Sequence, residues 1–125
     1  MKSEEGGPRG DPLRDKSYEF AIRIVKLARS LQRDEREFVL SRQVLRSGTA
    51  VGALVREAEF AQSKADFANK MAIALKEANE TEYWLCLLKD SEMISADEFS
   101  DLHPACRELI AMLVATVKTS KGDVR

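Results

Sequence analysis

Several residue types are scarce in this chain of 125 residues, and each shortage removes a class of protein. The two cysteines are too few and too far apart for a disulfide framework or a zinc site. No run approaches the roughly 18 apolar residues that a membrane-spanning helix needs, and residues 1–15 lack the hydrophobic stretch of a secretory signal. Only eight aromatic residues are present, which disfavours a β-sandwich or barrel. We therefore expect a cytoplasmic protein with no membrane segment.

Helix-favouring residues dominate the remaining composition. Ala, Leu, Glu, Lys and Arg make up 61 of the 125 residues, a fraction typical of long helices. Apolar residues recur at steps of three and four positions in four segments, as on one face of a helix. The predicted helices span residues 16–33, 38–62, 64–89 and 96–120. Short connections between long helices favour antiparallel neighbours, so the predicted fold is an all-α, antiparallel up-down four-helix bundle.

Signals at the helix ends support these boundaries. Asp15 is the expected N-cap of the first helix, while Ser63 and Ser95 each precede a carboxylate by three residues, as in a capping box. Pro104 is expected to kink or divide the fourth helix. Residues 1–15 carry three glycines and two prolines without apolar periodicity. We expect them to form a flexible N-terminal arm before a bundle domain at 16–121.

Gly48 and Gly52 are expected to mark a close helix–helix contact. Each glycine inside a helix costs about 1 kcal/mol relative to alanine, so a closely packed neighbour must offset that cost. Their spacing of four places both on one helix face, where the missing side chains let another backbone approach. A phosphate-binding loop is disfavoured because no lysine follows and no strand precedes the glycines.

The net charge of −1 conceals an uneven distribution along the chain. Residues 16–56 hold nine bases and four acids, whereas residues 57–125 hold eight bases and thirteen acids. This asymmetry has two interpretations, which the sequence leaves open: a basic face for RNA, or pairing between the basic and acidic halves of neighbouring subunits. The candidate RNA contacts are Arg23, Lys26, Arg33, Arg42, Arg46 and Arg56. Few aromatic side chains lie among them, so we expect contacts to phosphates rather than to bases.

Arg42 and Arg46 lie one helical turn apart and repel each other unless an anion lies between them. That anion is either an acidic side chain, Glu57 or Glu77, or an RNA phosphate. The expected structural ion pairs involve Glu57, Glu77 and Glu80. The single histidine, His103, belongs to no Glu-x-x-His pair of the kind that holds di-iron centres. We expect no metal, no cofactor and no enzymatic activity.

Three segments resemble a known family. They are EFVLSRQVLRSGTAVGALVREA (37–58), AQSKADFANKMAIALKEANETEYWL (61–85) and the ELI…LVATVKTSK tail (108–121). Over about residues 16–121 the chain resembles the bacterial four-helix-bundle family encoded in intervening sequences of 23S ribosomal RNA genes. The resemblance implies a short up-down bundle that assembles into a homopentamer. A related branch serves as an accessory protein to the reverse transcriptase of diversity-generating retroelements, where it binds RNA and the enzyme.

One position departs from the family. Members often carry Asn where this chain has Leu54, so one polar group is missing from the predicted contact between the second and third helices. The residues Arg42, Arg46, Gly48, Gly52, Glu57, Glu77 and Glu80 match.

We therefore expect a non-enzymatic homo-oligomer, a homopentamer by the resemblance, that associates with structured RNA through the basic face of its first two helices. Excess apolar surface on the third helix and the small residues of the second also favour oligomerisation. The alternative function is a structural scaffold or protein-binding module in which subunits pair through their charges and no RNA binds. Titration with structured RNA at two salt concentrations distinguishes the two.

Overall fold

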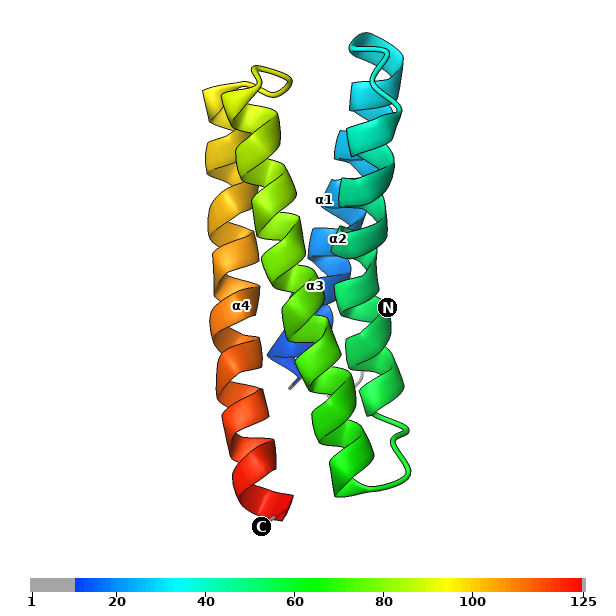
Figure 1. Cartoon of the computed structure of the whole chain (residues 1–125), viewed down its shortest axis with the longest axis vertical. Helices are drawn as coiled ribbons and strands as arrows, with labels where there is room; N and C mark the ends of the chain where they lie inside the picture. Colours follow the sequence, from blue (N-terminus) through cyan, green and yellow to red (C-terminus); the bar gives the residue numbers. More distant parts are fainter. Residues whose placement is uncertain (1–10, 125) are drawn as a thin grey trace, which may run out of the picture.

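The computed structural model describes residues 11–124, with side chains described as far as Lys121. Its four helices are α1 (Pro12–Asp34), α2 (Val39–Ala58), α3 (Lys64–Asp90) and α4 (Ala96–Val124), and the described residues contain no strand (Figure 1). Each helix runs antiparallel to the one before it, and the connections are four or five residues long. The prediction of an all-α up-down four-helix bundle is confirmed.

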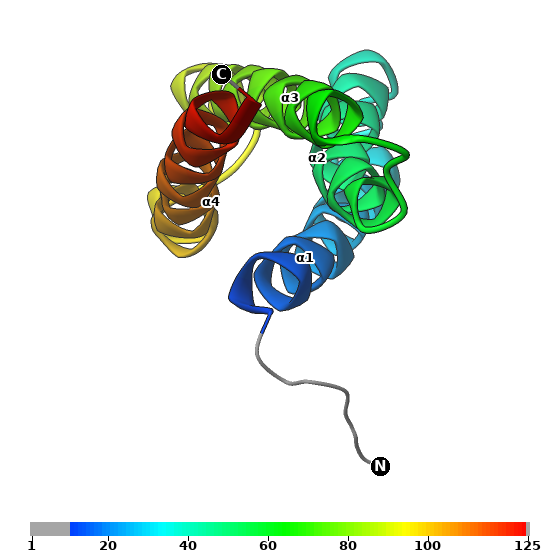
Figure 2. The same cartoon turned by 90° about the horizontal axis from the view of Figure 1, so that it is seen from below.

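The helices follow one another around the bundle in chain order. Each helix packs against the next, whereas the contact between α1 and α4 is the smallest of the helix contacts. Figure 2 shows the consequence end-on: the four helices form an open U, with α1 and α4 at its two ends. No helix within the described residues has an apolar stretch long enough to cross a membrane.

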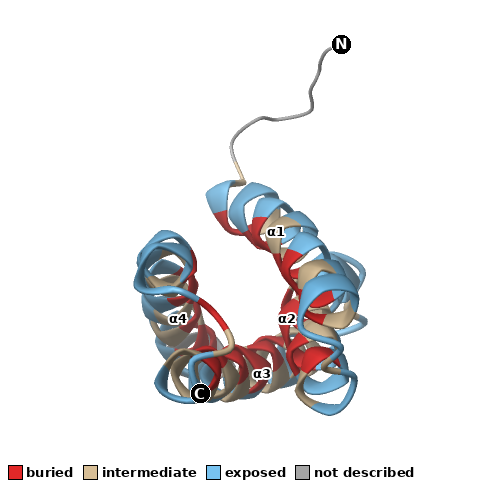
Figure 3. Ribbon diagram, turned by 90° about the horizontal axis from the view of Figure 1, so that it is seen from above, coloured by how far each residue is buried: buried red, intermediate tan, exposed pale blue. Residues whose placement is uncertain are grey.

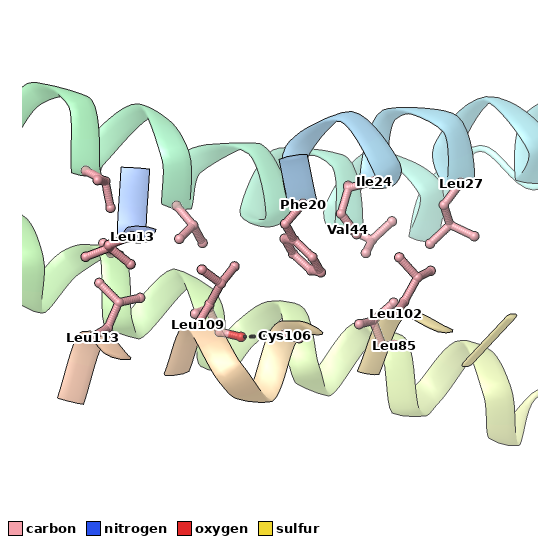
Figure 4. Packing of buried hydrophobic residues seen from close by; sticks show 14 of the residues in the cluster. Leu13, Phe20, Ile24, Leu27, Val44, Leu85, Leu102, Cys106, Leu109 and Leu113 are labelled. Atoms are coloured by element: carbon pink, nitrogen blue, oxygen red, sulfur yellow. Dashed lines mark hydrogen bonds between the residues drawn. The ribbon is translucent and has the colours of Figure 1, made fainter. Parts of the chain in front are cut away.

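The core lies inside this U, where the apolar stripes of the four helices face one another (Figure 3). Phe20 and Ile24 of α1 and Leu85 of α3 are at most 2% exposed, as is Leu109 of α4. The side chains of α1 point across the interior toward those of α4 (Figure 4). Burying a side chain of this size contributes about 1.5–3 kcal/mol, so the core holds the open arrangement together.

Helix α1 begins four residues earlier than expected. Asp11 is its N-cap, and the carboxylate accepts a hydrogen bond from the backbone N–H of Arg14 at 3.0 Å. Pro12 suits the first helical position because that position needs no N–H donor and favours the φ of proline. The expected start at Lys16, with Asp15 as cap, was therefore wrong. The rest of the expected arm, residues 1–10, lies outside the described residues.

Two other boundaries differ from the predictions. Helix α2 ends at Ala58 rather than near Gln62, and the chain leaves it through short-range turn bonds at Glu59 and Phe60. Phe60 is exposed, so continuing the helix would bury no further apolar stripe. Helix α4 continues to Val124 and Pro104 does not divide it.

The caps of the last two helices agree with the predictions. Ser63 Oγ accepts a hydrogen bond from the Asp66 N–H at 3.0 Å. Ser95 and Glu98 form a reciprocal pair of hydrogen bonds. Ser95 Oγ accepts from the Glu98 N–H at 3.0 Å, and the Glu98 carboxylate accepts from the Ser95 N–H at 2.9 Å. These reciprocal bonds fix where α4 begins.

Candidate nucleic-acid interface

Gly48 and Gly52 lie against α1. A Cβ atom added at Gly48 would lie 2.8 Å from Cγ2 of Ile24, and one added at Gly52 would lie 3.2 Å from the backbone oxygen of Ser17. A Cβ atom at Gly48 would overlap the Ile24 side chain, and a Cβ atom at Gly52 would press against the backbone of α1. The two glycines therefore let the backbones of α1 and α2 approach closely, and the neighbouring helix is α1.

This contact also fixes which residues of α1 and α2 lie at the same level. Ile24 lies opposite Gly48, and further along Gln32 Nε2 donates to Ser41 Oγ at 3.1 Å. Arg42 therefore lies near the last turn of α1, at the end of the bundle where the α1–α2 connection lies (Figure 1).

Arg46 points toward α3 and is neutralised there. Its guanidinium donates to both carboxylate oxygens of Glu77, at 3.1 and 3.2 Å, and to Glu80 at 2.6 Å. These bonds raise the pKa of Arg46, and the pKa of Glu80 is lowered by a hydrogen bond from Trp84 and then by Arg46. The guanidinium of Arg46 is thus paired with two carboxylates of its own chain.

A buried polar contact beside this pair escaped the sequence analysis. The hydroxyl of Thr81 on α3 lies 2.8 Å from that of Ser47 on α2 and 2.8 Å from the carbonyl of Glu77. Both hydroxyl residues are fully buried, and Leu54 packs at the edge of the core. The buried polar contact between α2 and α3 is thus made by Ser47 and Thr81, and not at position 54. A serine and a threonine on otherwise apolar helix faces are the only signal that the sequence offers.

Glu57 has a different partner from those expected. Its carboxylate lies 3.8 Å from Nζ of Lys70 on α3, a long ion pair at the surface. Neither Arg42 nor Arg46 pairs with it within the described residues. At this distance and exposure the pair contributes little to stability.

Two more candidate cations have partners in their own chain. Arg23 donates from Nη2 to the backbone carbonyl of Asp101 on α4, across the smallest helix contact. Arg33 donates to its neighbour Asp34 at 2.8 and 3.1 Å, which raises the pKa of Arg33 and lowers that of Asp34. Arg23 therefore helps to hold α1 against α4.

Lys26, Arg42 and Arg56 are exposed, and their side chains form no hydrogen bond or ion pair with other residues of the range 11–121, over which side chains are described. Arg29, which was not among the candidates, shares this property. Arg42 and Arg56 are fourteen residues apart on α2, hence about 21 Å along the helix axis. The structure thus divides the six expected contacts into three that are engaged and three that are available.

The surface near these cations is unusually apolar. The exposed large hydrophobic residues are Tyr18, Ile22, Val25, Phe38, Val39, Phe60 and Tyr83. All but Tyr83 lie on α1, on α2 or directly beside α2. A shallow groove of about 260 Å³ runs between these two helices, lined mainly by small residues and by Tyr18 and Arg56. The expectation of excess apolar surface on the third helix stays a prediction: Tyr83 of α3 is 59% exposed, whereas Trp84 and Leu87 are half-buried.

No three His, Cys, Asp or Glu side chains among the described residues gather so that they could hold a metal ion. Nε2 of His103 donates a hydrogen bond to the Glu82 carboxylate on α3 at 3.0 Å, and the His103 ring stacks on Phe99 with centroids 4.5 Å apart. The histidine is thus part of the contact between α3 and α4.

Comparison with known proteins assigns the family. A solved structure of a protein with unknown function, from the S23 ribosomal protein family of Bacteroides thetaiotaomicron VPI-5482, is 52% identical and superposes with a TM-score of 0.84. The match covers 85% of this chain and 98% of that one. No curated protein is similar to the chain. The sequence pattern of the 23S rRNA-intervening sequence proteins matches residues 13–115, and the chain belongs to this family.

Proposed function

We propose that this protein is a non-enzymatic, self-associating helical bundle that binds structured RNA through phosphate contacts from α2. The observation that carries the proposal is the pair Arg42 and Arg56, two exposed arginines on one helix without a carboxylate partner in the described residues. Arginine forms forked hydrogen bonds that match a phosphate group. Contacts of this kind read shape and charge, not sequence.

Self-association strengthens the electrostatic argument. A single chain carries a net charge of −1, but several copies would set their exposed α2 arginines in one array. The exposed apolar residues of the α1–α2 hairpin provide surface for assembly. A homopentamer is the assembly that the family resemblance implies. We place the protein in the cytoplasm, where the thiols of Cys86 and Cys106 would stay reduced.

The test is a fluorescence titration of the full chain with a labelled RNA hairpin at about 50 and 200 mM salt. We expect weak sequence selectivity and a steep loss of affinity with salt, about 0.7–0.9 log units per log unit of salt for each phosphate neutralised. Arg42→Ala/Arg56→Ala should weaken binding and flatten that slope.

The matched control is Lys64→Ala/Lys118→Ala, which removes the same charge from two exposed positions on other helices. If both double variants lose the same affinity, attraction is general and α2 is not the interface. If wild-type protein does not bind at about 50 mM salt, the scaffold function, in which the basic residues serve only subunit contacts, replaces RNA binding.

A further inference from the structure

Each of the two α2 arginines that lack a carboxylate partner in the described range has an exposed phenylalanine within about one turn. Phe38, the N-cap of α2, is 42% exposed and precedes Arg42 by four residues. Phe60 is 79% exposed and follows Arg56 by four residues, in the turn that ends the helix. At about 3.6 residues per helical turn, Phe38, Arg42 and Arg56 lie within about 40° of one another around α2. One face of α2 thus presents an aromatic ring and an arginine at each of its ends.

The surface between these two ends is smooth. Thr49 and Ala53 share the face with the arginines, and their short side chains help to line the groove of about 260 Å³ between α1 and α2. Tyr18 of α1 lines the same groove, and its ring is exposed. Three of the four exposed aromatic side chains among the described residues therefore lie along this face or at its edge, and the fourth, Tyr83, lies on α3.

The carboxylates next to the two ends of this face are engaged within the chain. They are Glu37, which accepts from the backbone N–H groups of Val39 and Ser41 at 3.3 and 2.9 Å, Glu59, which lies 3.6 Å from Arg14, and Glu57, which lies 3.8 Å from Lys70. The charges of the two α2 arginines are therefore open to an anion from outside the chain.

An aromatic ring beside a guanidinium matches a nucleotide whose base is unpaired. The ring stacks on the base, and the guanidinium donates to a flanking phosphate. In a duplex the bases stack on one another and their faces are closed to protein side chains, so duplex RNA would use the arginines alone. Stacking tolerates any base, which agrees with contacts that read charge and shape.

We propose that this face of α2 binds single-stranded RNA, with unpaired bases stacked on Phe38 and Phe60 and the flanking phosphates bound by Arg42 and Arg56. The inference rests on the proposed function and names its ligand class, which is unpaired nucleotides rather than duplex. Phenylalanine is usually buried, so only the packed bundle shows that these two rings are exposed. The exposed aliphatic residues of α1 stay available for subunit contacts.

The first experiment compares two labelled RNAs at the same salt concentration. One is a single strand of about twelve nucleotides without self-complementarity, and the other is the same strand annealed to its complement. We expect the single strand to bind the full chain about tenfold or more tightly than the duplex does, although the duplex carries more phosphates. A fluorescent base analogue within the single strand should be quenched on binding, because stacking quenches its emission.

Phe38→Leu/Phe60→Leu separates stacking from charge, because leucine keeps an apolar side chain and removes the ring. We expect a loss of single-strand affinity of about tenfold or more, an unchanged duplex affinity and an unchanged salt slope, since no phosphate contact is lost. Both rings lie outside the core, so circular dichroism, the melting temperature and the mass from light scattering should stay as in the wild type. The matched control is Tyr83→Leu, which removes an exposed ring from α3 and should keep the wild-type affinity.

Equal affinity for the single strand and the duplex, wild-type affinity of the Phe38→Leu/Phe60→Leu variant, or an equal loss in Tyr83→Leu would overturn the stacking while phosphate binding stands. A smaller assembly mass of the phenylalanine variant would also overturn it, because the rings would then serve subunit contacts. If neither RNA binds at about 50 mM salt, both the stacking and the proposed function are overturned.

Discussion

Arg46 on α2 and Glu77 on α3 form a two-point ion pair, with Nη1 3.2 Å from one carboxylate oxygen and Nη2 3.1 Å from the other. Glu77 is only 8% exposed, and the Arg46 guanidinium supplies two hydrogen bonds to its carboxylate at this depth. The sequence left open whether an acidic side chain or an RNA phosphate lies beside Arg42 and Arg46. For Arg46 it is an acidic side chain, Glu77. Arg42, one turn away, has no such partner among the described residues.

We predict that Arg46→Ala lowers the free energy of unfolding by about 1–3 kcal/mol, because the nearly buried Glu77 carboxylate loses its donors. The cost stays below that of a fully buried pair because the Arg46 side chain is 51% exposed and water can replace it. Urea denaturation measures the change. Arg42→Ala is the matched control and should stay within about 0.5 kcal/mol of wild type. Equal effects of the two substitutions would contradict the assignment.

The pKa of Glu80 predicts a loss of stability in acid. Hydrogen bonding from Trp84, and then Arg46, lowers this pKa in the folded protein. The folded state therefore releases the proton more readily than the unfolded chain, whose glutamate titrates near pH 4.3. The resulting stability is present above about pH 4.3 and is lost as the pH falls through the folded pKa. In the Glu80→Gln variant, the free energy of unfolding should fall less steeply as the pH is lowered. An acid slope equal to that of the wild type would contradict this prediction.

Gly48→Ala should destabilise the protein in spite of the higher helix propensity of alanine. The new Cβ would meet Cγ2 and Cγ1 of the fully buried Ile24 at 2.8 and 2.9 Å. Overpacking of this kind costs about 1–3 kcal/mol, more than the gain of about 1 kcal/mol from propensity. Ile24→Ala removes the clashing atoms, so a double-mutant cycle should give a favourable coupling between the two changes. A Gly48→Ala melting temperature at or above wild type would refute the close contact.

The Cys106 thiol should be inert in the native protein. Burial raises its pKa to about 12, and the Sγ atom lies 3.5 Å from the carbonyl oxygen of Ala78. Because thiolate is the reactive form, alkylation by iodoacetamide at pH about 8 should modify Cys106 only as fast as the chain unfolds. The Cys86→Ser variant isolates this rate by mass spectrometry. Rapid labelling of Cys106 in a variant that remains folded would be incompatible with the packing described.

The four helices and most of their ends follow from local sequence patterns. Apolar periodicity identifies a helix whatever its neighbours are, because the apolar stripe of each helix has to be buried against another element. The serine caps at Ser63 and Ser95 act over three residues and are equally local. The start of α1 was missed because Asp11 and Pro12, which begin the helix, also suit a loop.

Which basic residues lack a carboxylate partner depends on how the helices pack. Arg42 and Arg46 share one helix and similar neighbours, but Arg46 meets a carboxylate 31 residues away, on a helix that the local sequence does not place. That meeting depends on how α2 is rotated and how far it is shifted against α3, which the burial of the apolar stripes sets. The exposed stripe of Tyr18, Ile22 and Val25 was likewise undecided, since periodicity shows that a face is apolar but not whether the bundle covers it. Ion pairing and exposure are properties of the packed bundle because both require distances between residues far apart in the chain.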